Sequence, residues 1–222
     1  MSRFGRRAGI WITVAALVVV AAAVGLWWKP RQSVTLPQSA CWGMLSKDDI
    51  KPLAGKNGTA VAKTTETVAS VLKPGPKPPT FHDADCLVSW NRKDTLLYLD
   101  FGAISSADVQ DSEELDRPSQ APDKLGPGIT LLWQSSGVSL SFPCTGVTWP
   151  YLYSPDVQVF VGSGNAPAGY KLTGAGLAPE SAMNAYASIA LKVSKAIAKQ
   201  LPCTNTLTFP HSAPTIKATP PS

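Results

Sequence analysis

The chain is poor in the residues and motifs that usually mark an active site. Its 222 residues include 2 histidines, His82 and His211, and no HExxH, GxSxG or phosphate-loop pattern. A Ser-His-Asp hydrolase needs a histidine beside a nucleophile, whereas His82 follows a Pro-rich stretch and His211 lies in the C-terminal tail. Glycoside hydrolysis needs two carboxylates, and no pair of acids is marked by its spacing. The sequence therefore predicts no catalytic residue and no cofactor.

Basic charge is also missing from most of the chain. The net charge of +5 comes from five residues near the N-terminus, Arg3, Arg6, Arg7, Lys29 and Arg31. From Cys41 onward, 15 Lys and Arg stand against 15 Asp and Glu. A nucleic-acid-binding domain needs a basic face, so this balance argues against a nucleic-acid partner.

Patterns typical of a metal site are lacking as well. The four cysteines, Cys41, Cys86, Cys144 and Cys203, never stand within 40 residues of each other, which argues against a zinc knuckle. The acids between Ser105 and Arg117 do not follow the spacing of an EF-hand loop and have no central glycine. His82, beside Asp83 and Asp85, is interpreted as an exposed loop residue. We expect no metal ligands.

What the chain does have is a run of nineteen uncharged, mostly apolar residues at positions 10–28. As a helix it would span roughly 28 Å, close to the hydrocarbon thickness of a bilayer. An uncleaved anchor is favoured over a cleaved signal peptide, whose apolar region is usually about 7–15 residues, and over a buried core helix. Trp27 and Trp28 suit a membrane interface. A twin-Arg signal at Arg6 and Arg7, and lipidation at Cys41, are weaker interpretations.

The charges around this run predict its orientation. Three arginines and the terminal amine precede it and two basic residues follow, which places the N-terminus in the cytoplasm. The chain is then a single-pass plasma-membrane protein whose main domain is extracytoplasmic and whose first partner is the lipid bilayer. The expected parts are a cytoplasmic region 1–9, an anchor 10–28, a juxtamembrane linker 29–40, a domain 41–209 and a disordered Pro/Thr-rich tail 210–222.

The cysteines fit this topology. An even number in an oxidising compartment favours two disulfides, with three pairings open, over free buried thiols.

Hydrophobic patterning predicts an α+β domain with an antiparallel sheet, one short helix and one long helix. The short helix is expected over 47–54, kinked or ended early by Pro52, and the long helix over 180–201. Residues 58–72 favour extended structure, although 65–72 also fit a helix. The expected strands are 86–90 paired with 95–101, 129–133 paired with 138–142, and 156–162. Loops are expected at 73–80, 118–128 and 162–169.

Trp149, Tyr151 and Tyr153 form the most exposed-looking aromatic cluster in the sequence. Core packing is the default for such residues, and a surface that binds a glycan or an envelope protein is the alternative.

A cysteine pattern covers residues 41–102. Cys41 is followed by Leu45-Ser46, the acids Asp48 and Asp49, and Gly55, and Cys86 is followed by Trp90. This pattern resembles that of secreted and membrane-anchored actinobacterial proteins of unknown function. The resemblance implies a Cys41–Cys86 disulfide and a small α+β fold, which leaves Cys144 to pair with Cys203. The halves 41–102 and 129–209 would then each have one helix, strands and one disulfide, so an internal duplication is a hypothesis.

The sequence leaves two hypotheses for the function. The first is a non-enzymatic binding or assembly module of the cell envelope, held outside the membrane. The alternative is a secreted hydrolase or carbohydrate-acting enzyme whose carboxylate site the sequence does not mark.

Overall fold

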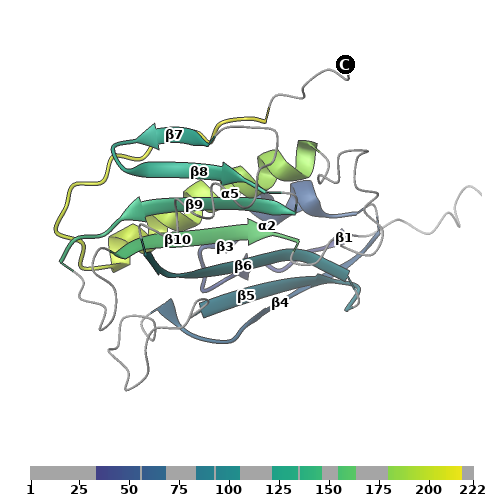
Figure 1. The fold of residues 1–222 in the computed structure, drawn as a ribbon. Coiled ribbons are helices and arrows are strands. Elements are labelled where there is room, and N and C mark those ends of the chain that lie inside the picture. The colour runs from purple at the N-terminus through teal and green to yellow at the C-terminus, as the bar shows by residue number, and fades with distance from the viewer. Residues whose placement is uncertain are drawn as a thin grey trace, which may run out of the picture. The chain divides into compact units, whose positions relative to one another are not determined.

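The computed structural model describes residues 34–55, 57–68, 84–92, 94–105, 122–134, 136–146, 155–163 and 180–216. Most of them form one sheet, with strand order β1-β4-β5-β6-β10-β9-β8-β7 (Figure 1). Its strands are β1 (Val34–Thr35), β4 (Gly58–Thr64), β5 (Ala84–Trp90), β6 (Asp94–Ser105), β10 (Pro155–Gly162), β9 (Gly137–Pro143), β8 (Ile129–Trp133) and β7 (Asp123–Gly126). A second, two-stranded sheet pairs β2 (Ser39–Ala40) with β3 (Leu45–Ser46), and the helices are α2 (Lys47–Ile50), η1 (Lys51–Leu53) and α5 (Glu180–Gln200).

The large sheet is built from two meanders of three antiparallel strands. The first is β4-β5-β6 and the second is β8-β9-β10, and they meet where β6 pairs antiparallel with β10. Short β1 adds a parallel pair at one edge and β7 adds an antiparallel pair at the other. The predicted antiparallel α+β domain is thus confirmed.

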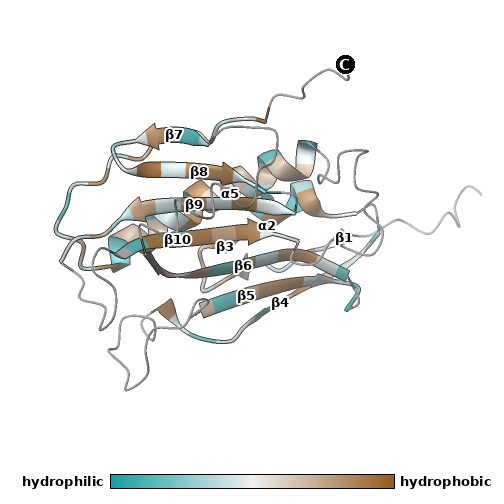
Figure 2. Cartoon of the chain, in the orientation of Figure 1, coloured by the Kyte–Doolittle hydropathy of each residue, from teal (hydrophilic) through white to brown (hydrophobic). Residues whose placement is uncertain are grey.

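One face of the sheet carries the hydrophobic core. Side chains alternate between the two faces of a strand, so Leu97, Leu99 and Phe101 of β6 share a face, and each is at most 1% exposed. Their register continues across the sheet, for example from Leu99 to Val161 of β10. Figure 2 shows hydrophobic residues along much of β8, β9 and β10.

Helix α5 covers this core face beside β9 and β10, and it lies behind these strands in Figure 1. Met183, Tyr186, Ala190 and Ile197 are buried at the i, i+3, i+4 spacing that the sequence showed. The long helix was predicted over 180–201, and the structure agrees within one residue.

The segment from Leu36 to Leu53 covers the core face over the other meander. Trp42 packs edge-on against Phe101 at a ring-centroid distance of 5.3 Å, and Ile50 is fully buried. The start of α2 is a capping box, in which Ser46 and Asp49 bond each other's side chain and backbone. Pro52 falls in the 3₁₀ turn η1, so the short helix ends early, as expected for a proline at this position.

Three segments differ from the expectation. Residues 34–40, predicted as linker, join the domain, because β1 pairs with β4 and Leu36 is 7% exposed. Part of the loop predicted at 118–128 forms strand β7, which backbone pairing with β8 holds despite its polar sequence. The start of the tail expected to be disordered is packed, since the Ile216 N–H donates to Asn184 Oδ1 at 2.8 Å.

Both disulfides are present, with the pairing that the resemblance implied. Cys41 bonds Cys86 at a Cα–Cα distance of 5.3 Å, and Cys144 bonds Cys203 at 4.9 Å. Each half therefore has a three-stranded meander, a helical segment and one disulfide. The helical segment precedes the strands in the first half but follows them in the second, so a tandem copy alone does not give this order.

The anchor predicted at 10–28 lies outside the described residues. Among the residues that are described, no helix has the length and apolar character needed to cross a bilayer.

Candidate functional site on the polar face of the sheet

The face of the sheet turned away from α5 carries an unusual mixture of polar and aromatic side chains. Because residues alternate, Tyr98 and Asp100 of β6 project opposite to Leu97 and Leu99. Of the residues that share this side, seven define what we call the polar face: Asp85, Tyr98, Asp100, Ser139, Ser141, Gln158 and Phe160. All the described helices that contact the sheet pack on its other side.

Two carboxylates lie next to each other in the first meander. Asp85 of β5 and Asp100 of β6 are direct partners in the strand register. Residues opposite each other on antiparallel strands have Cβ atoms about 4.5–5.5 Å apart, and like charges at that distance repel. Asp100 is 6% exposed, whereas Asp85 is partly exposed. Asp85 is thus the more accessible of the two carboxylates.

Asp85 has a hydrogen-bond partner that fixes its position. Asp85 Oδ1 accepts a bond of 2.6 Å from the Thr65 hydroxyl, and the Asp85 carbonyl accepts one of 3.2 Å from the Thr65 N–H. Asp85 is therefore positioned before any ligand arrives.

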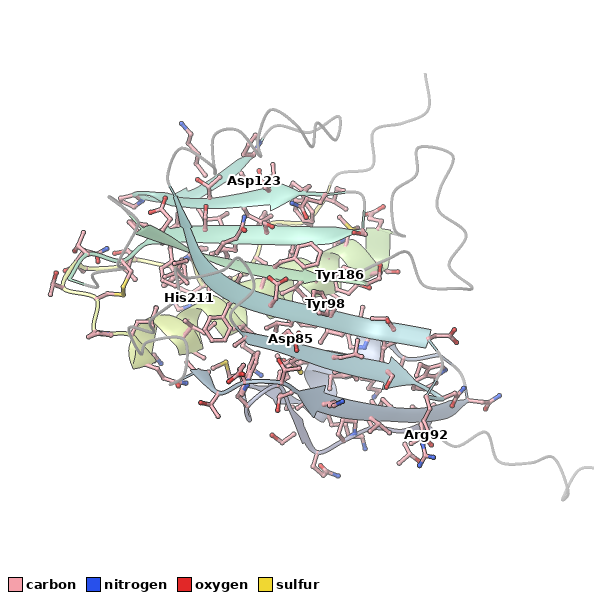
Figure 3. The ribbon with its side chains drawn as sticks, turned by 60° about the horizontal axis from the view of Figure 1, so that its bottom comes forward. Asp85, Arg92, Tyr98, Asp123, Tyr186 and His211 are labelled. Carbon is pink, nitrogen blue, oxygen red and sulfur yellow. A yellow bond between two sulfur atoms is a disulfide. The ribbon has the colours of Figure 1, made fainter. Side chains whose placement is uncertain are left out.

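Tyr98 lies beside both acids, and Figure 3 shows it on β6 next to Asp85 on β5. Burial, the negative charges of Asp100 and Asp85, and the hydrogen bond to Asp100 raise the pKa of Tyr98 to about 12. The raised pKa shows that this environment favours the neutral phenol, which can donate a hydrogen bond.

An aromatic pair continues the site across the junction of the two meanders. The rings of Tyr98 and Phe160 are 6.3 Å apart between centroids and tilted by 52°. The Phe160 ring lies across Gly162, since a Cβ built on that glycine would be 2.7 Å from Phe160 Cζ. A side chain at position 162 would also meet the Ser136 carbonyl at 2.6 Å. The glycine thus leaves room for the ring.

Small polar side chains extend the same face over the second meander. Ser139 is in register with Phe160, and Ser141 is in register with Gln158. Both serines are at most 6% exposed, while Gln158 and Phe160 are partly exposed. The result is a surface of carboxylate, phenol, amide and ring, which can bond hydroxyl groups and stack on flat apolar surfaces.

The structure describes only some of the residues that the sequence singled out. Trp149, Tyr151 and Tyr153 lie outside the described residues, as do His82 and most of the acidic segment 105–117. The two disulfides predicted from the four cysteines are confirmed, and they do not line the polar face. Trp133 belongs to the core, where its Nε1 donates to Asp123 Oδ2 at 2.8 Å.

In the described part of the chain, no three His, Cys, Asp or Glu side chains gather as a group that could hold an ion.

Sequence reasoning did not single out the polar face. The signal was present in Tyr98-Leu99-Asp100-Phe101, where polar and apolar residues alternate inside a hydrophobic run. The pairing of Asp85 with Asp100, and of Tyr98 with Phe160, depends on strand register and could not be read from the chain.

Comparison with known proteins adds no assignment. No family model matches the chain, and no curated protein or solved structure matches it either.

Proposed function

We propose that this protein is a membrane-anchored, extracytoplasmic binding module that recognises envelope glycans through its polar face. The apolar run 10–28 and its flanking charges support the anchor and the orientation. Two disulfides support an oxidising compartment, since such bonds persist outside the reducing cytosol.

One observation carries the assignment of the ligand. Asp85 lies in register with Asp100, and Tyr98 contacts Phe160, all on the face opposite α5. Sugars present both hydroxyl groups, which donate to carboxylates, and flat C–H surfaces, which stack on aromatic rings. Asp85 and Gln158 supply the first kind of contact and Phe160 supplies the second. A partly exposed site with few charges suits a neutral polymer better than a nucleic acid.

The test uses the full chain in detergent micelles and an array of envelope-type oligosaccharides. Asp85→Asn and Phe160→Ala should each weaken the binding of the captured glycan by about tenfold, since each removes a central contact. Asp48→Asn is the matched control, because Asp48 is an exposed acid on α2 away from the polar face. If no oligosaccharide binds, or if Asp48→Asn weakens binding equally, the glycan assignment is wrong. Capture of an envelope protein that competes for the same face would assign a protein partner instead.

The carboxylate pair also favours a second candidate, a retaining glycosidase. Such enzymes place two carboxyl groups about 5–5.5 Å apart. Register partners on antiparallel strands have Cβ atoms about 4.5–5.5 Å apart, so their carboxyl groups can approach to such a distance. A captured glycan incubated with the full chain would then release reducing ends, and Asp85→Asn would abolish the release. Binding without any release supports the binding module.

A further inference from the structure

A cavity lies at the C-terminal end of α5, away from the polar face. It has a volume of about 290 Å³, at the lower end of the range for small-molecule sites. Its walls are the last turns of α5 and residues 203–209, which belong to the segment 201–216, here called the C-terminal strap. The side chains that matter are Lys195, Ala198, Lys199, Asn205, Leu207 and Phe209.

The strap wall is held firmly in place. Cys203 is bonded to Cys144, and the Thr204 N–H donates to the Thr145 carbonyl at 2.7 Å. Asn205 Oδ1 accepts from the Thr145 N–H at 2.8 Å, while Asn205 Nδ2 donates to the Pro143 carbonyl at 3.0 Å. The cavity is therefore preformed. The Asn205 amide is already hydrogen-bonded to the backbone, so Asn205 shapes the wall and is not assigned to ligand binding.

The floor of the cavity is apolar. Phe209 packs edge-on against the core residue Phe142 at 5.4 Å between ring centroids. Leu207 and Ala198 are partly buried against the same core and complete the floor. An apolar group on a ligand would lose contact with water there.

The rim is cationic. Lys195 and Lys199 are four residues apart on α5, so their side chains emerge one above the other. Residues 181–216 contain three lysines and no aspartate or glutamate. The third lysine, Lys192, forms an ion pair with Asp49 and does not line the cavity. The rim thus offers two ammonium groups with no carboxylate among the lining residues.

Lysines near a helix C-terminus also complement the helix dipole, which explains part of their placement. That role leaves most of the donors of each ammonium group available, since each carries three. The Lys195 ammonium makes one long bond, 3.5 Å, to the His211 carbonyl.

We propose that this cavity binds a small organic anion, with a phosphate or carboxylate on Lys195 and Lys199 and an apolar body on Leu207 and Phe209. The proposal does not depend on the glycan-binding function, because the cavity and the polar face share no residue.

The test is calorimetric titration of the full chain in phosphatidylcholine nanodiscs with phenyl phosphate, inorganic phosphate and benzyl alcohol. Phenyl phosphate should bind at least about tenfold more tightly than either fragment, because it uses both the rim and the floor. Lys195→Gln/Lys199→Gln should weaken its binding by about tenfold or more, since charge-assisted bonds are lost. Ala198→Phe, which fills the cavity, should also abolish binding.

Lys192→Gln is the matched control, because it removes the same charge from the same helix outside the cavity. Its binding should stay within about twofold of the unchanged chain. The proposal is overturned if phenyl phosphate does not bind below about 10 mM, if Lys192→Gln weakens binding as much as the double variant, or if inorganic phosphate binds equally well.

A further titration distinguishes two sources of the anion. Dihexanoyl phosphatidic acid, used below its micelle concentration, presents the same phosphate on a lipid. Tighter binding than phenyl phosphate assigns a lipid headgroup, and weaker binding assigns a soluble organic phosphate. Both results support the cavity as an anion site.

Discussion

Ser194 of α5 places in the core of the domain a hydroxyl that has no hydrogen-bond partner among the described residues. Its side chain is 0% exposed. A buried hydroxyl without a partner costs stability, because it has lost water and gained nothing.

Ser194→Ala should therefore raise the free energy of unfolding by about 1 kcal/mol, since alanine removes the unsatisfied group and favours the helix. Ser188→Ala is the control, because Ser188 is exposed on the same helix and its hydroxyl donates to the Asn184 carbonyl at 2.9 Å. Denaturant unfolding followed by tryptophan fluorescence measures both. A loss of stability in Ser194→Ala would show that the hydroxyl has a partner in solution.

Tyr98 should lose its proton at a higher pH than an ordinary tyrosine. Its pKa is raised from 10.0 to about 12 by burial first and then by the charges of Asp100 and Asp85. The neutral phenol is the form that the fold favours. Its contribution to stability is therefore present below pH 10.0 and lost as the pH rises through about 12.

The measurement is the tyrosinate absorbance of the unchanged chain minus that of Tyr98→Phe. The difference should rise near pH 12, and Asp85→Asn should move it toward lower pH because one negative charge is gone. A difference that rises near pH 10.0 would show that the acids do not act on Tyr98.

At the scale of elements, Asp49 joins the two helical pieces that cover the core. It accepts bonds of 2.6 Å from both the N–H and the hydroxyl of Ser46, and it pairs with Lys192 of α5. Partial burial alone would raise the pKa of Asp49, but the bonds from Lys192 and Ser46 outweigh it and hold the pKa below 3.8. The contribution of this carboxylate is thus present above pH 3.8 and lost as the pH falls through the lowered pKa.

A double-mutant cycle of Asp49→Asn and Lys192→Gln tests this link. Both groups are partly exposed to solvent, so the coupling free energy should be modest, about 0.5 kcal/mol at neutral pH. The stability difference between the unchanged chain and Asp49→Asn should shrink in acid below pH 3.8. Exposed Lys47→Gln paired with Asp49→Asn serves as the uncoupled control. A coupling that persists unchanged at the most acidic pH would contradict the ion pair.

At the scale of the whole molecule, the two disulfides are the strongest constraints on the fold that mutation can test. The two bonds close loops with separations of 45 and 59 residues. Cys144→Ser/Cys203→Ser should lower the free energy of unfolding by about 4 kcal/mol in the chain-entropy picture, and Cys41→Ser/Cys86→Ser by a similar amount. A non-reducing peptide map checks the pairing directly, and a peptide joining Cys86 to Cys144 would contradict it.

The sequence was informative wherever local pattern decides structure. Periodicity predicted α5 to within one residue. Strand-favouring runs on either side of a short turn segment predicted the hairpins β5-β6 and β8-β9. It missed β7, because a four-residue edge strand of Asp-Lys-Leu-Gly has no pattern of its own and forms by pairing. It missed the packing of Ile216 for a similar reason, since composition does not report a tertiary contact.

The candidate sites were harder to predict because both depend on long-range placement. Asp85 meets Asp100 only through strand register, and the cavity needs the strap to return along α5. Tyr98 and Phe160 are separated by the whole connection between the two meanders, so their contact has no local signature.

The order of the disulfides has a consequence for oxidative folding. Cys41 pairs with the next cysteine, Cys86, and Cys144 pairs with the next, Cys203, so neither loop encloses the other. When the chain emerges from its N-terminus onward, the first bond can close before the second pair of cysteines is present, and no reshuffling is needed to reach the final pairing. However, β6 gains its central partner only when β10 follows, starting at Pro155. A chain that has emerged only as far as the first meander therefore carries one closed disulfide and an unpaired strand edge on β6, which is a state prone to aggregation.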